Sequence, residues 1–583
     1  MILDSQALED GATLTCDVCI MGSGAAGMTV ACELDGAGLD VLLLEAGGSK
    51  YDSAQQQALR GEVGEGSPHS PPDMYRRRML GGATTIWGGR CVPLSPIDLQ
   101  QRDHVPHSGW PMTWPELERH YPKAQEYCEA GDYAYTVAEA LGQAAPPTIA
   151  GFVSGDVDAT EIERFSPPTD FGKRYLDRLA KSQNIRVMLC TRALRLREQD
   201  GTIDAMEAAA PGRKLTVKAR HYVLATGGLE TPRLLMNSDG TRRGGLGNQS
   251  GALGRFYMCH VENTLGLLRL QPSTRAATVH FERTPDGIYA RRKFTLTPAA
   301  QQREGLLNCA ARLHYPLIAD PSHRNGVLSA MYLVKDMIIP EYRRKLATIE
   351  LANRDLLSRD ARFWASHMAN IGIDSLGVAR FGVDWMRRRI LARRKLPFVA
   401  FESRDGSYPL DVNAEQIPDE VNAVTLTDTP DADGLRQIKV HWRLAGQDVD
   451  SLLRTMHVMR QAFAQSGCAI LELGDGIEDQ IRASTPVGGH HIGTARMADN
   501  PSQGVVDRHC RVHGLDNLHL AGAAVFPTCG HANPTLTIVA LSVRLAERLK
   551  QVTRPAATPE RIAQAGFPQA GFAQAGFAQA GFT

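Results

Sequence analysis

The chain has 583 residues, 43% hydrophobic and 22% charged, which is typical of a globular protein and excludes a disordered or fibrous one. Its 64 basic residues balance 64 acidic ones, so its net charge does not favour nucleic acid as a partner. No apolar run approaches the ~18 residues of a membrane-spanning helix, and the acidic beginning is unlike a secretory signal. Eleven cysteines, an odd number, indicate free thiols in a reducing compartment. We therefore expect a cytoplasmic protein.

The first motif is a glycine-rich turn between a short apolar strand and a helix. Strands are expected over 16–21 and 41–44, with a helix over 28–35 between them. In the turn, Gly22 permits a tight bend, Gly24 lets the backbone approach a pyrophosphate, and Gly27 lets helix and strand pack closely. Glu45 follows the second strand, where a carboxylate can hold ribose hydroxyls and disfavours a 2′-phosphate. The context predicts a dinucleotide site that does not take NADP.

Cys16 and Cys19 form a CxxC pair inside the first predicted strand. The spacing suits a redox or zinc site, but no second cysteine pair stands at zinc-finger spacing. We favour two buried, inert side chains.

A second dense region lies near the end of the chain. It contains the pair His490-His491, a probable strand over 518–521 followed by a turn at Gly522, and a helical pattern that ends at about Lys550. Asn533-Pro534-Thr535 opens this helix, with Asn suited to the cap and Pro to the first helical position. The helix would then present the positive end of its dipole to a ligand.

Three segments, at 22–27, 80–89 and 490–537, together resemble the glucose–methanol–choline (GMC) flavoprotein oxidoreductases. The resemblance runs from about residue 17 to residue 550. The motifs around His490 and Asn533 are most similar to those of pyranose-oxidase-like and bacterial sugar-dehydrogenase-like members. It implies an FAD cofactor and hydride transfer from an alcohol carbon to N5 of the flavin. The positive helix end would then stabilise the negative charge of the reduced flavin.

The resemblance also implies roles for individual residues. His490 matches the catalytic histidine, which takes the hydroxyl proton, and Asn533 matches its partner position. His491 and His531 are candidates for substrate contact, and no metal ligands are expected. The expected cofactor-binding residues are Gly22, Ser23, Gly24, Ala25, Ala26, Gly27, Glu45, Ala46, Gly81, Gly82, Thr85, Trp87, Gly88, Ala225, Gly522, Ala523, Pro534 and Thr535.

One departure from the family pattern bears on the cofactor. Covalently flavinylated relatives often carry a histidine just before the tryptophan of the 80–89 segment, and Ile86 stands there in this chain. Isoleucine has no nucleophile, so we expect non-covalent FAD.

The expected fold is α/β, with a Rossmann-like FAD-binding domain assembled from discontinuous segments and a substrate-binding domain built on an antiparallel sheet. Short alternating strands over 288–293, 424–427 and 437–442 are expected in that sheet. The FAD-binding domain is expected over 12–112, 184–259 and 484–552, the substrate-binding domain over 113–183 and 260–483 with a helical insertion over 340–397, and a low-complexity tail over 553–583.

The insertion carries three basic clusters interleaved with aromatic and aliphatic residues. It could form a lid that docks on an anionic partner or membrane surface, or a solvated helical insertion whose arginines meet local carboxylates. We favour the second interpretation. The clusters are Arg343-Arg344-Lys345, Arg387-Arg388-Arg389 and Arg393-Arg394-Lys395.

The sequence therefore predicts an FAD-dependent oxidoreductase that oxidises the CH–OH group of a sugar, glycoside or cyclic secondary alcohol, with His490 as general base. One alternative is a non-redox, lyase-type reaction with FAD as a structural element; a flavin-binding assembly subunit without turnover is another. The electron acceptor stays open between oxygen, a quinone and a protein carrier. No haem-attachment Cys-x-x-Cys-His occurs, so a cytochrome would be a separate chain.

Overall fold

The computed structural model describes most of the chain. The described residues are 1–553 without 4, 6–7, 241–243, 275, 317, 339–359, 393, 398–399, 404 and 487–488. The expected tail beyond Thr553 lies outside them, and so do Arg343, Arg344, Lys345 and Arg393 of the basic clusters.

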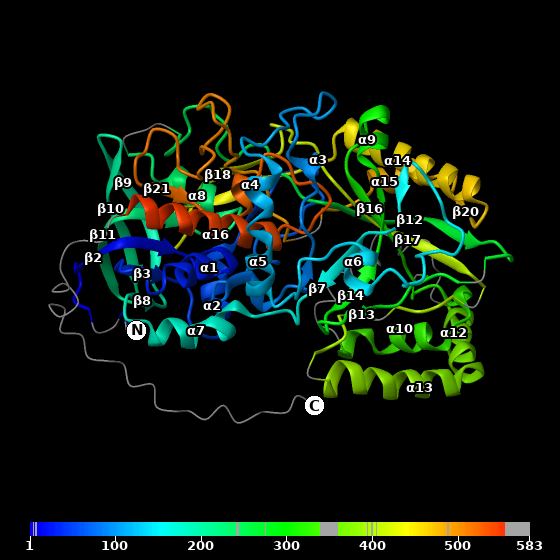
Figure 1. Cartoon of the computed structure of the whole chain (residues 1–583). Coiled ribbons are helices and arrows are strands. Elements are labelled where there is room, and N and C mark those ends of the chain that lie inside the picture. The colour runs from blue at the N-terminus through cyan, green and yellow to red at the C-terminus, as the bar shows by residue number, and fades with distance from the viewer. Residues whose placement is uncertain are drawn as a thin grey trace.

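An eight-stranded sheet forms the first half of the molecule (Figure 1). Its order is β1-β8-β3-β2-β11-β10-β9, with β21 paired to β11. The strands from β1 to β11 and the added β21 pair in parallel, whereas β10 is antiparallel to both β11 and β9. The bounds are β1 Ile2–Leu3, β2 Thr13–Met21, β3 Val41–Leu44, β8 Ile185–Met188, β9 Arg192–Gln199, β10 Thr202–Ala210, β11 Arg213–Leu224 and β21 Leu518–Leu520.

The order of β2, α1 (Ala25–Leu34) and β3 is the expected strand–helix–strand unit. All four residues of β3 are buried, as its unbroken apolar sequence predicts for a central parallel strand. Helix α16 (Thr535–Val552) packs against α1, although more than 500 residues separate the two along the chain. Cys16 and Cys19 are buried free thiols within β2, as predicted.

Residues 113–183, expected with the substrate-binding side, are divided between the two halves. Helix α5 (Tyr121–Cys128) contacts α16 and helix α7 (Phe171–Lys181) contacts α1, so both join the core of the first half. Strands β6 (Val157–Asp158) and β7 (Ile162–Phe165) join sheets of the second half. The capping box of Thr113 and Glu116 opens the short helix α4 (Trp114–Glu118).

A six-stranded antiparallel sheet, in the order β20-β12-β17-β16-β15-β6, forms the second half (Figure 1). Helices α14 (Gly446–Ser466) and α15 (Ile477–Arg482) pack against it. Its remaining strands are β12 Val261–Leu270, β15 Phe294–Leu296, β16 Cys309–Leu313, β17 Ser407–Ala414 and β20 Ala469–Glu472.

The three strands that were predicted for this sheet lie elsewhere. The first is β14 (Tyr289–Arg292), in the four-stranded sheet β13-β14-β7-β5. The others are β18 (Ala423–Pro430) and β19 (Arg436–His441), which form the three-stranded sheet β18-β19-β4. Alternating polarity locates a strand, but long-range pairing decides which sheet it joins. The other strands here are β4 Gly61–Val63, β5 Arg90–Cys91 and β13 Glu282–Arg283.

The helical insertion forms a separate layer beside the second half (Figure 1). It begins at α10 (Gly326–Ile338), earlier than expected, and continues through α12 (Ala361–Ile373), α13 (Ser375–Trp385) and a π-helical turn over Met386–Leu391. A small core that includes Leu328 and Phe363 holds it together. None of the helices in the described part of the chain combines the length and apolar character required to cross a bilayer.

Short helices complete the described elements. They are α2 Ser53–Gln56, η2 Gln57–Leu59, η3 Gly82–Thr85, α3 Pro96–Leu99, α6 Val137–Leu141, α8 Glu230–Asn237, α9 Pro298–Glu304, η4 Pro321–His323 and η6 Ala523–Val525.

Candidate active site

A cavity of about 2970 Å³ runs between the two halves of the molecule. The glycine-rich turn after β2 lines one part of it, and His490 and Asn533 line another. Ordinary small-molecule pockets measure about 300–1,000 Å³, so this cavity has room for a dinucleotide and a second ligand. Segments from both ends of the sequence therefore meet around one space.

The glycine-rich turn has no room for side chains on its protein side. Gly22 has a φ of +101°, and a Cβ there would lie 2.5 Å from the carbonyl oxygen of Ala225. A Cβ on Gly27 would lie 1.9 Å from the carbonyl oxygen of Gly22. A Cβ on Gly24 would meet no protein atom within 4 Å, and this residue lines the cavity. The bare backbone at the N-terminus of α1 thus fits a pyrophosphate, which needs close approach to amide groups.

Glu45, at the end of β3, holds this turn in place. Its Oε2 accepts hydrogen bonds from the amide (3.0 Å) and hydroxyl (2.6 Å) of Ser23, and its Oε1 accepts one from the amide of Gly47 (2.8 Å). Burial raises the pKa of Glu45, and these hydrogen bonds oppose that rise. The carboxyl group also lines the cavity, so a ribose hydroxyl could use its remaining lone pairs.

Most of the expected cofactor-binding residues line the cavity. Gly27 and Gly81 do not, because they pack behind its wall, where the amide of Gly81 donates to the hydroxyl of Ser23 (3.3 Å). The lining residues are Gly22, Ser23, Gly24, Ala25, Ala26, Glu45, Ala46, Gly82, Thr85, Trp87, Gly88, Ala225, Gly522, Ala523, Pro534 and Thr535.

His490 belongs to a chain of hydrogen bonds assembled from three distant segments. Its Nδ1 lies 2.8 Å from Nδ1 of His260, whose Nε2 lies 3.3 Å from the carbonyl oxygen of Cys529. On the other side, Nε2 of His490 lies 3.1 Å from Nδ2 of Asn533. Every imidazole nitrogen in this chain therefore faces a partner.

The partners determine which nitrogen of His490 can act as a base. A carbonyl oxygen only accepts, so Nε2 of His260 carries the proton. Burial lowers the pKa of His260 to about 4, so the ring is neutral near pH 7 and its Nδ1 accepts. The proton between the rings then belongs to Nδ1 of His490, which leaves the lone pair on Nε2 beside Asn533 and the cavity. The site can accept a proton at that atom.

Asn533 does not cap helix α16, contrary to the expectation from its residue type. Helix α16 begins at Thr535 with Pro534 before it, and no side chain caps it. The amide group of Asn533 contacts His490 instead, and its Oδ1 is buried without a hydrogen-bond partner among the described residues. Pro534 and Thr535 still line the cavity, so the positive end of α16 is directed into the cavity.

The other two candidate histidines differ in position. His491 lines the cavity and lies beside the rings of His69 and Tyr257, at centroid distances of 6.3 and 6.2 Å. Burial lowers its pKa well below the usual value. His531 does not line the cavity, contrary to prediction: its ring is turned into the protein, where Nε2 lies 2.8 Å from Nζ of Lys293.

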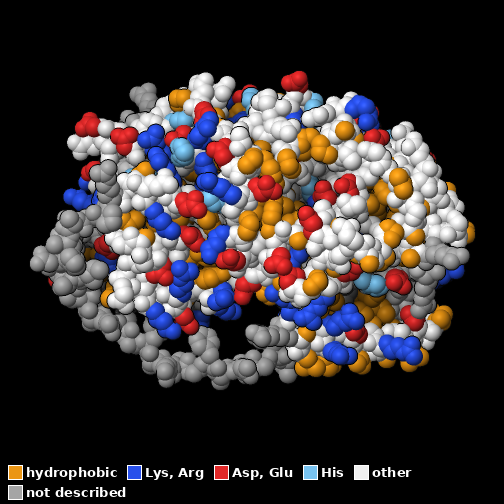
Figure 2. Space-filling model, viewed as in Figure 1, with side chains coloured by type: hydrophobic (Ala, Val, Ile, Leu, Met, Phe, Trp, Pro, Cys, Tyr) orange, Lys and Arg blue, Asp and Glu red, His pale blue; other side chains and the backbone are white. Residues whose placement is uncertain are grey.

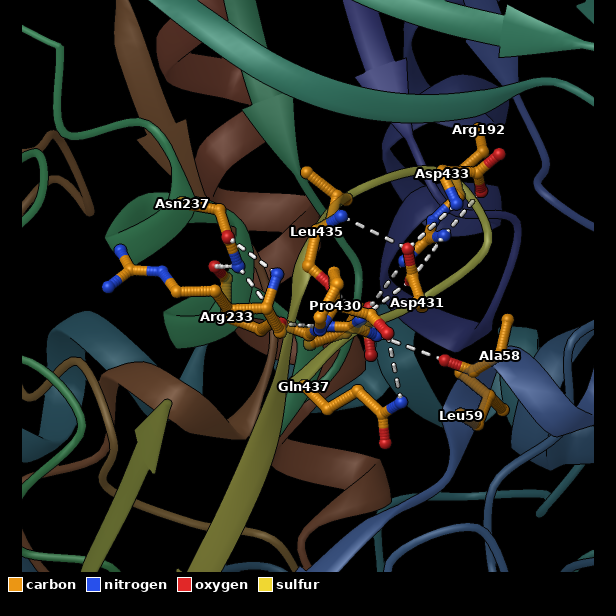
Figure 3. Close-up of polar contacts among 12 residues, drawn as sticks. Ala58, Leu59, Arg192, Arg233, Asn237, Pro430, Asp431, Asp433, Leu435 and Gln437 are labelled. Carbon is orange, nitrogen blue, oxygen red and sulfur yellow. Dashed lines mark hydrogen bonds and ion pairs between the residues drawn. The ribbon is translucent and has the colours of Figure 1, made fainter. Parts of the chain in front are cut away.

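A buried ionic network forms part of the cavity wall, and Figure 3 shows its contacts around Arg192, Arg233 and Asp431. Arg233 of α8 bonds Asp431 (2.7 Å), Glu230 (2.9 Å) and the carbonyl oxygen of Ala58 (3.0 Å). Arg192 bonds Asp431 (2.7 Å) as well. Burial opposes the ionisation of Glu230, but the surrounding arginines outweigh it and hold the pKa of Glu230 at about 2. The network joins the β18–β19 hairpin to the first half of the molecule.

Two walls of the cavity differ in chemistry. One is polar, where Nδ2 of Asn263 donates to the hydroxyl of Ser484 (2.6 Å) and Nε2 of Gln480 donates to the carbonyl of Thr264 (2.9 Å). The other is apolar and comes from the insertion and from Tyr315, which precedes it. The polar lining residues are Glu262, Asn263, Thr264, Asp479, Gln480, Ser484 and Thr485, and the apolar ones include Tyr315, Met331, Val378, Phe381 and Trp385.

Among the residues of this site that sequence reasoning missed, His260 is the one that contacts His490. His260 stands just before β12, as one of 18 histidines, and no local motif marks it. It reaches His490 through an antiparallel bridge, in which Met258 and Ile492 exchange backbone hydrogen bonds (2.9 and 3.1 Å).

Comparison with known families agrees with this geometry. A family model described as FAD dependent oxidoreductase matches residues 17–341, more than half of the chain, and one described as GMC oxidoreductase matches residues 418–542. The chain belongs to the GMC oxidoreductases. It is an FAD-dependent oxidoreductase, and the glycine-rich turn, the carboxylate of Glu45 and the N-terminus of α16 fit that cofactor.

The individual relatives that match over most of the chain have low sequence identity to it. The chain is 24% identical to 6'''-hydroxyparomomycin C oxidase of Streptomyces lividus and 25% identical to paromamine 6'-oxidase of Streptomyces fradiae, in each case over 91% of this chain and 90% of the relative. The crystal structure of formate oxidase matches with a TM-score of 0.50 and 17% identity, over 93% of this chain and 99% of that one. This last similarity shows the fold alone.

Proposed function

We propose that this enzyme oxidises a CH–OH group of a polyhydroxylated molecule, a sugar or glycoside, with His490 as the general base. The observation that carries the proposal is the position of Nε2 of His490, which faces Asn533 in the cavity that the glycine-rich turn also lines. FAD, when bound, accepts the hydride that leaves the alcohol carbon.

The residues of the chain have separate tasks in this proposal. Nε2 of His490 takes the hydroxyl proton, and His260 keeps that nitrogen unprotonated beforehand. The unpartnered Oδ1 of Asn533 accepts a hydrogen bond from the substrate and orients it. The amides at the N-terminus of α16 favour negative charge in the cavity.

Two observations support a polyhydroxylated substrate. The wall formed by Glu262, Asn263, Thr264 and Gln480 offers donors and acceptors to several hydroxyl groups. Two of the relatives that match over 90% of their own length are named as oxidases of 6'''-hydroxyparomomycin C and of paromamine. A glycoside therefore fits better than a simple aliphatic alcohol.

Anaerobic mixing of the holoenzyme with a panel of sugars, glycosides, cyclitols and aliphatic alcohols tests this proposal. We expect the flavin absorbance near 450 nm to bleach fastest with a sugar or glycoside. Bleaching by aliphatic alcohols alone would contradict the proposed substrate class, and product formed without bleaching would contradict the proposed reaction.

We also propose that FAD is held without a covalent bond. Ile86 lines the cavity at the position where flavinylated relatives often carry a histidine, and its side chain has no nucleophile. Acid precipitation of the holoenzyme should release the flavin into the supernatant. Flavin that stays with the washed precipitate would contradict this.

A further inference from the structure

Large exposed hydrophobic side chains are concentrated in the helical insertion. Of thirteen such side chains among the described residues, nine lie within residues 326–391. These nine are Leu333, Trp364, Met368, Ile373, Leu376, Val383, Met386, Ile390 and Leu391. Soluble monomers rarely expose a contiguous apolar patch of this kind unless the patch has a binding function.

Helix α13 has two apolar faces, and only one of them is used for packing inside the protein. Leu376 and Val383 stand seven residues apart and therefore lie on one face of the helix, with 64% and 69% of their surfaces exposed. The opposite face of the same helix, with Val378, Phe381 and Trp385, lines the cavity. The inner face accounts for the packing of α13, so its outer apolar face needs a separate explanation.

Arginines border this outer face. Arg380 and Arg387 follow Leu376 and Val383 by four residues each, which places both on the same edge of the helix. Neither has an ion-pair partner among the residues that the structure describes, whereas Arg388 pairs with Asp384 (2.8 Å). Figure 2 shows the hydrophobic side chains along the lower edge of the molecule, where Figure 1 places α13, with Lys and Arg side chains beside them.

In place of the solvated insertion that the sequence favoured, we propose that the outer face of α13 docks on an anionic lipid membrane. An apolar stripe bordered by cationic side chains is the pattern of helices that lie in the plane of the interface, with apolar groups among the acyl chains and arginines at lipid phosphates. A neutral protein surface would satisfy the apolar stripe but would leave the arginines without a counter-charge. The charge pattern therefore favours the membrane over a second copy of the chain.

Co-sedimentation of the holoenzyme with vesicles tests the proposal. We expect binding to vesicles of phosphatidylcholine with phosphatidylglycerol, weaker binding to phosphatidylcholine alone, and loss of the difference in high salt because screening weakens the attraction. The double variant Leu376→Ser/Val383→Ser should lower partitioning about tenfold, and Arg380→Gln/Arg387→Gln should remove the preference for the anionic vesicles.

The matched control is Val153→Ser/Val421→Ser, which changes two exposed valines (78% and 52%) outside the insertion and should bind like the wild type. Flavin absorbance and thermal melting establish that each variant is folded. Failure to bind either vesicle, or equal binding by the Leu376/Val383 variant, overturns the proposal. Light scattering that shows a dimer in the wild type and a monomer in that variant also overturns it, in favour of an interface between two copies.

Discussion

The two ends of the cavity are built on opposite principles. At the glycine-rich turn, backbone atoms make the surface, and the essential property is that side chains are absent. At His490, the side chains of His490 and Asn533 make the surface with the buried His260 behind them, and the essential property is the direction of each hydrogen bond. The first end depends on local geometry and the second on tertiary contacts, so each should fail under a different kind of substitution.

The largest effect is expected from added atoms at the glycine-rich turn. A Cβ on Gly27 would overlap the carbonyl of Gly22, so Gly27→Val should displace α1 and abolish FAD binding. Gly24→Ala meets open space and should leave the apoprotein as stable as the wild type, while it lowers FAD affinity about tenfold or more by blocking the pyrophosphate. Thermal melting of the apoprotein and titration with FAD separate the two effects.

Gly446→Ala is the control for this pair, because its Cβ also meets no atom within 4 Å but the residue does not line the cavity. Full FAD affinity in the Gly24 variant would show that the phosphates lie elsewhere.

Removing the base is expected to slow the chemistry without loss of the cofactor. In His490→Ala, flavin reduction by substrate should fall by about 10²–10⁴-fold, the usual contribution of a general base, while FAD stays bound. Stopped-flow absorbance under anaerobic conditions measures this rate. His280→Ala changes an exposed histidine outside the cavity, so its flavin should be reduced at the wild-type rate. Flavin reduction at the wild-type rate in His490→Ala would refute the assignment of His490 as the base.

A substitution in the buried ionic network tests whether the cavity wall also depends on paired charges. Glu230→Gln removes the carboxylate that pairs with Arg76, Arg192 and Arg233. It should lower the free energy of unfolding at pH 7 by about 3–5 kcal/mol. Because the pKa of Glu230 in the folded protein is about 2 and its ordinary value is about 4.3, this stabilisation is present above about pH 4.3 and is lost as the pH falls toward 2.

The melting temperatures of wild type and Glu230→Gln should therefore converge as the pH falls below about 4.3. Glu62→Gln, which removes an exposed pair with Lys439 (3.4 Å), should change the melting temperature little at any pH. A constant difference between wild type and Glu230→Gln at all pH values would contradict the depressed pKa.

The smallest effect is expected at His260, which acts through His490. His260→Phe removes the acceptor for Nδ1 of His490 and should slow flavin reduction about tenfold, equivalent to one lost hydrogen bond of about 1.4 kcal/mol. His260→Asn keeps an acceptor and should restore much of the rate. Because His260 is neutral above about pH 4, the rate of flavin reduction in the wild type should show no pH dependence from His260 near pH 7. Equal losses in both variants would indicate a packing role only.

The sequence also predicted elements whose signal is local. The buried strand β3 and the turn before α1 are each specified by neighbouring residues, and the structure has them where they were expected. The role of Asn533 was not local: its type suits a helix cap, but the contact with His490 determines where its amide group points. His531 likewise carries the right chemistry and is turned toward Lys293.

By itself, then, the sequence determined the dinucleotide turn, the family and the pair His490 and Asn533, because glycine spacing and short motifs act over a few residues. Only the tertiary structure decided which strands share a sheet, which imidazole supports His490 and which face of α13 is exposed. These features depend on contacts between residues hundreds of positions apart, and neither hydrophobic periodicity nor residue type specifies such a partner.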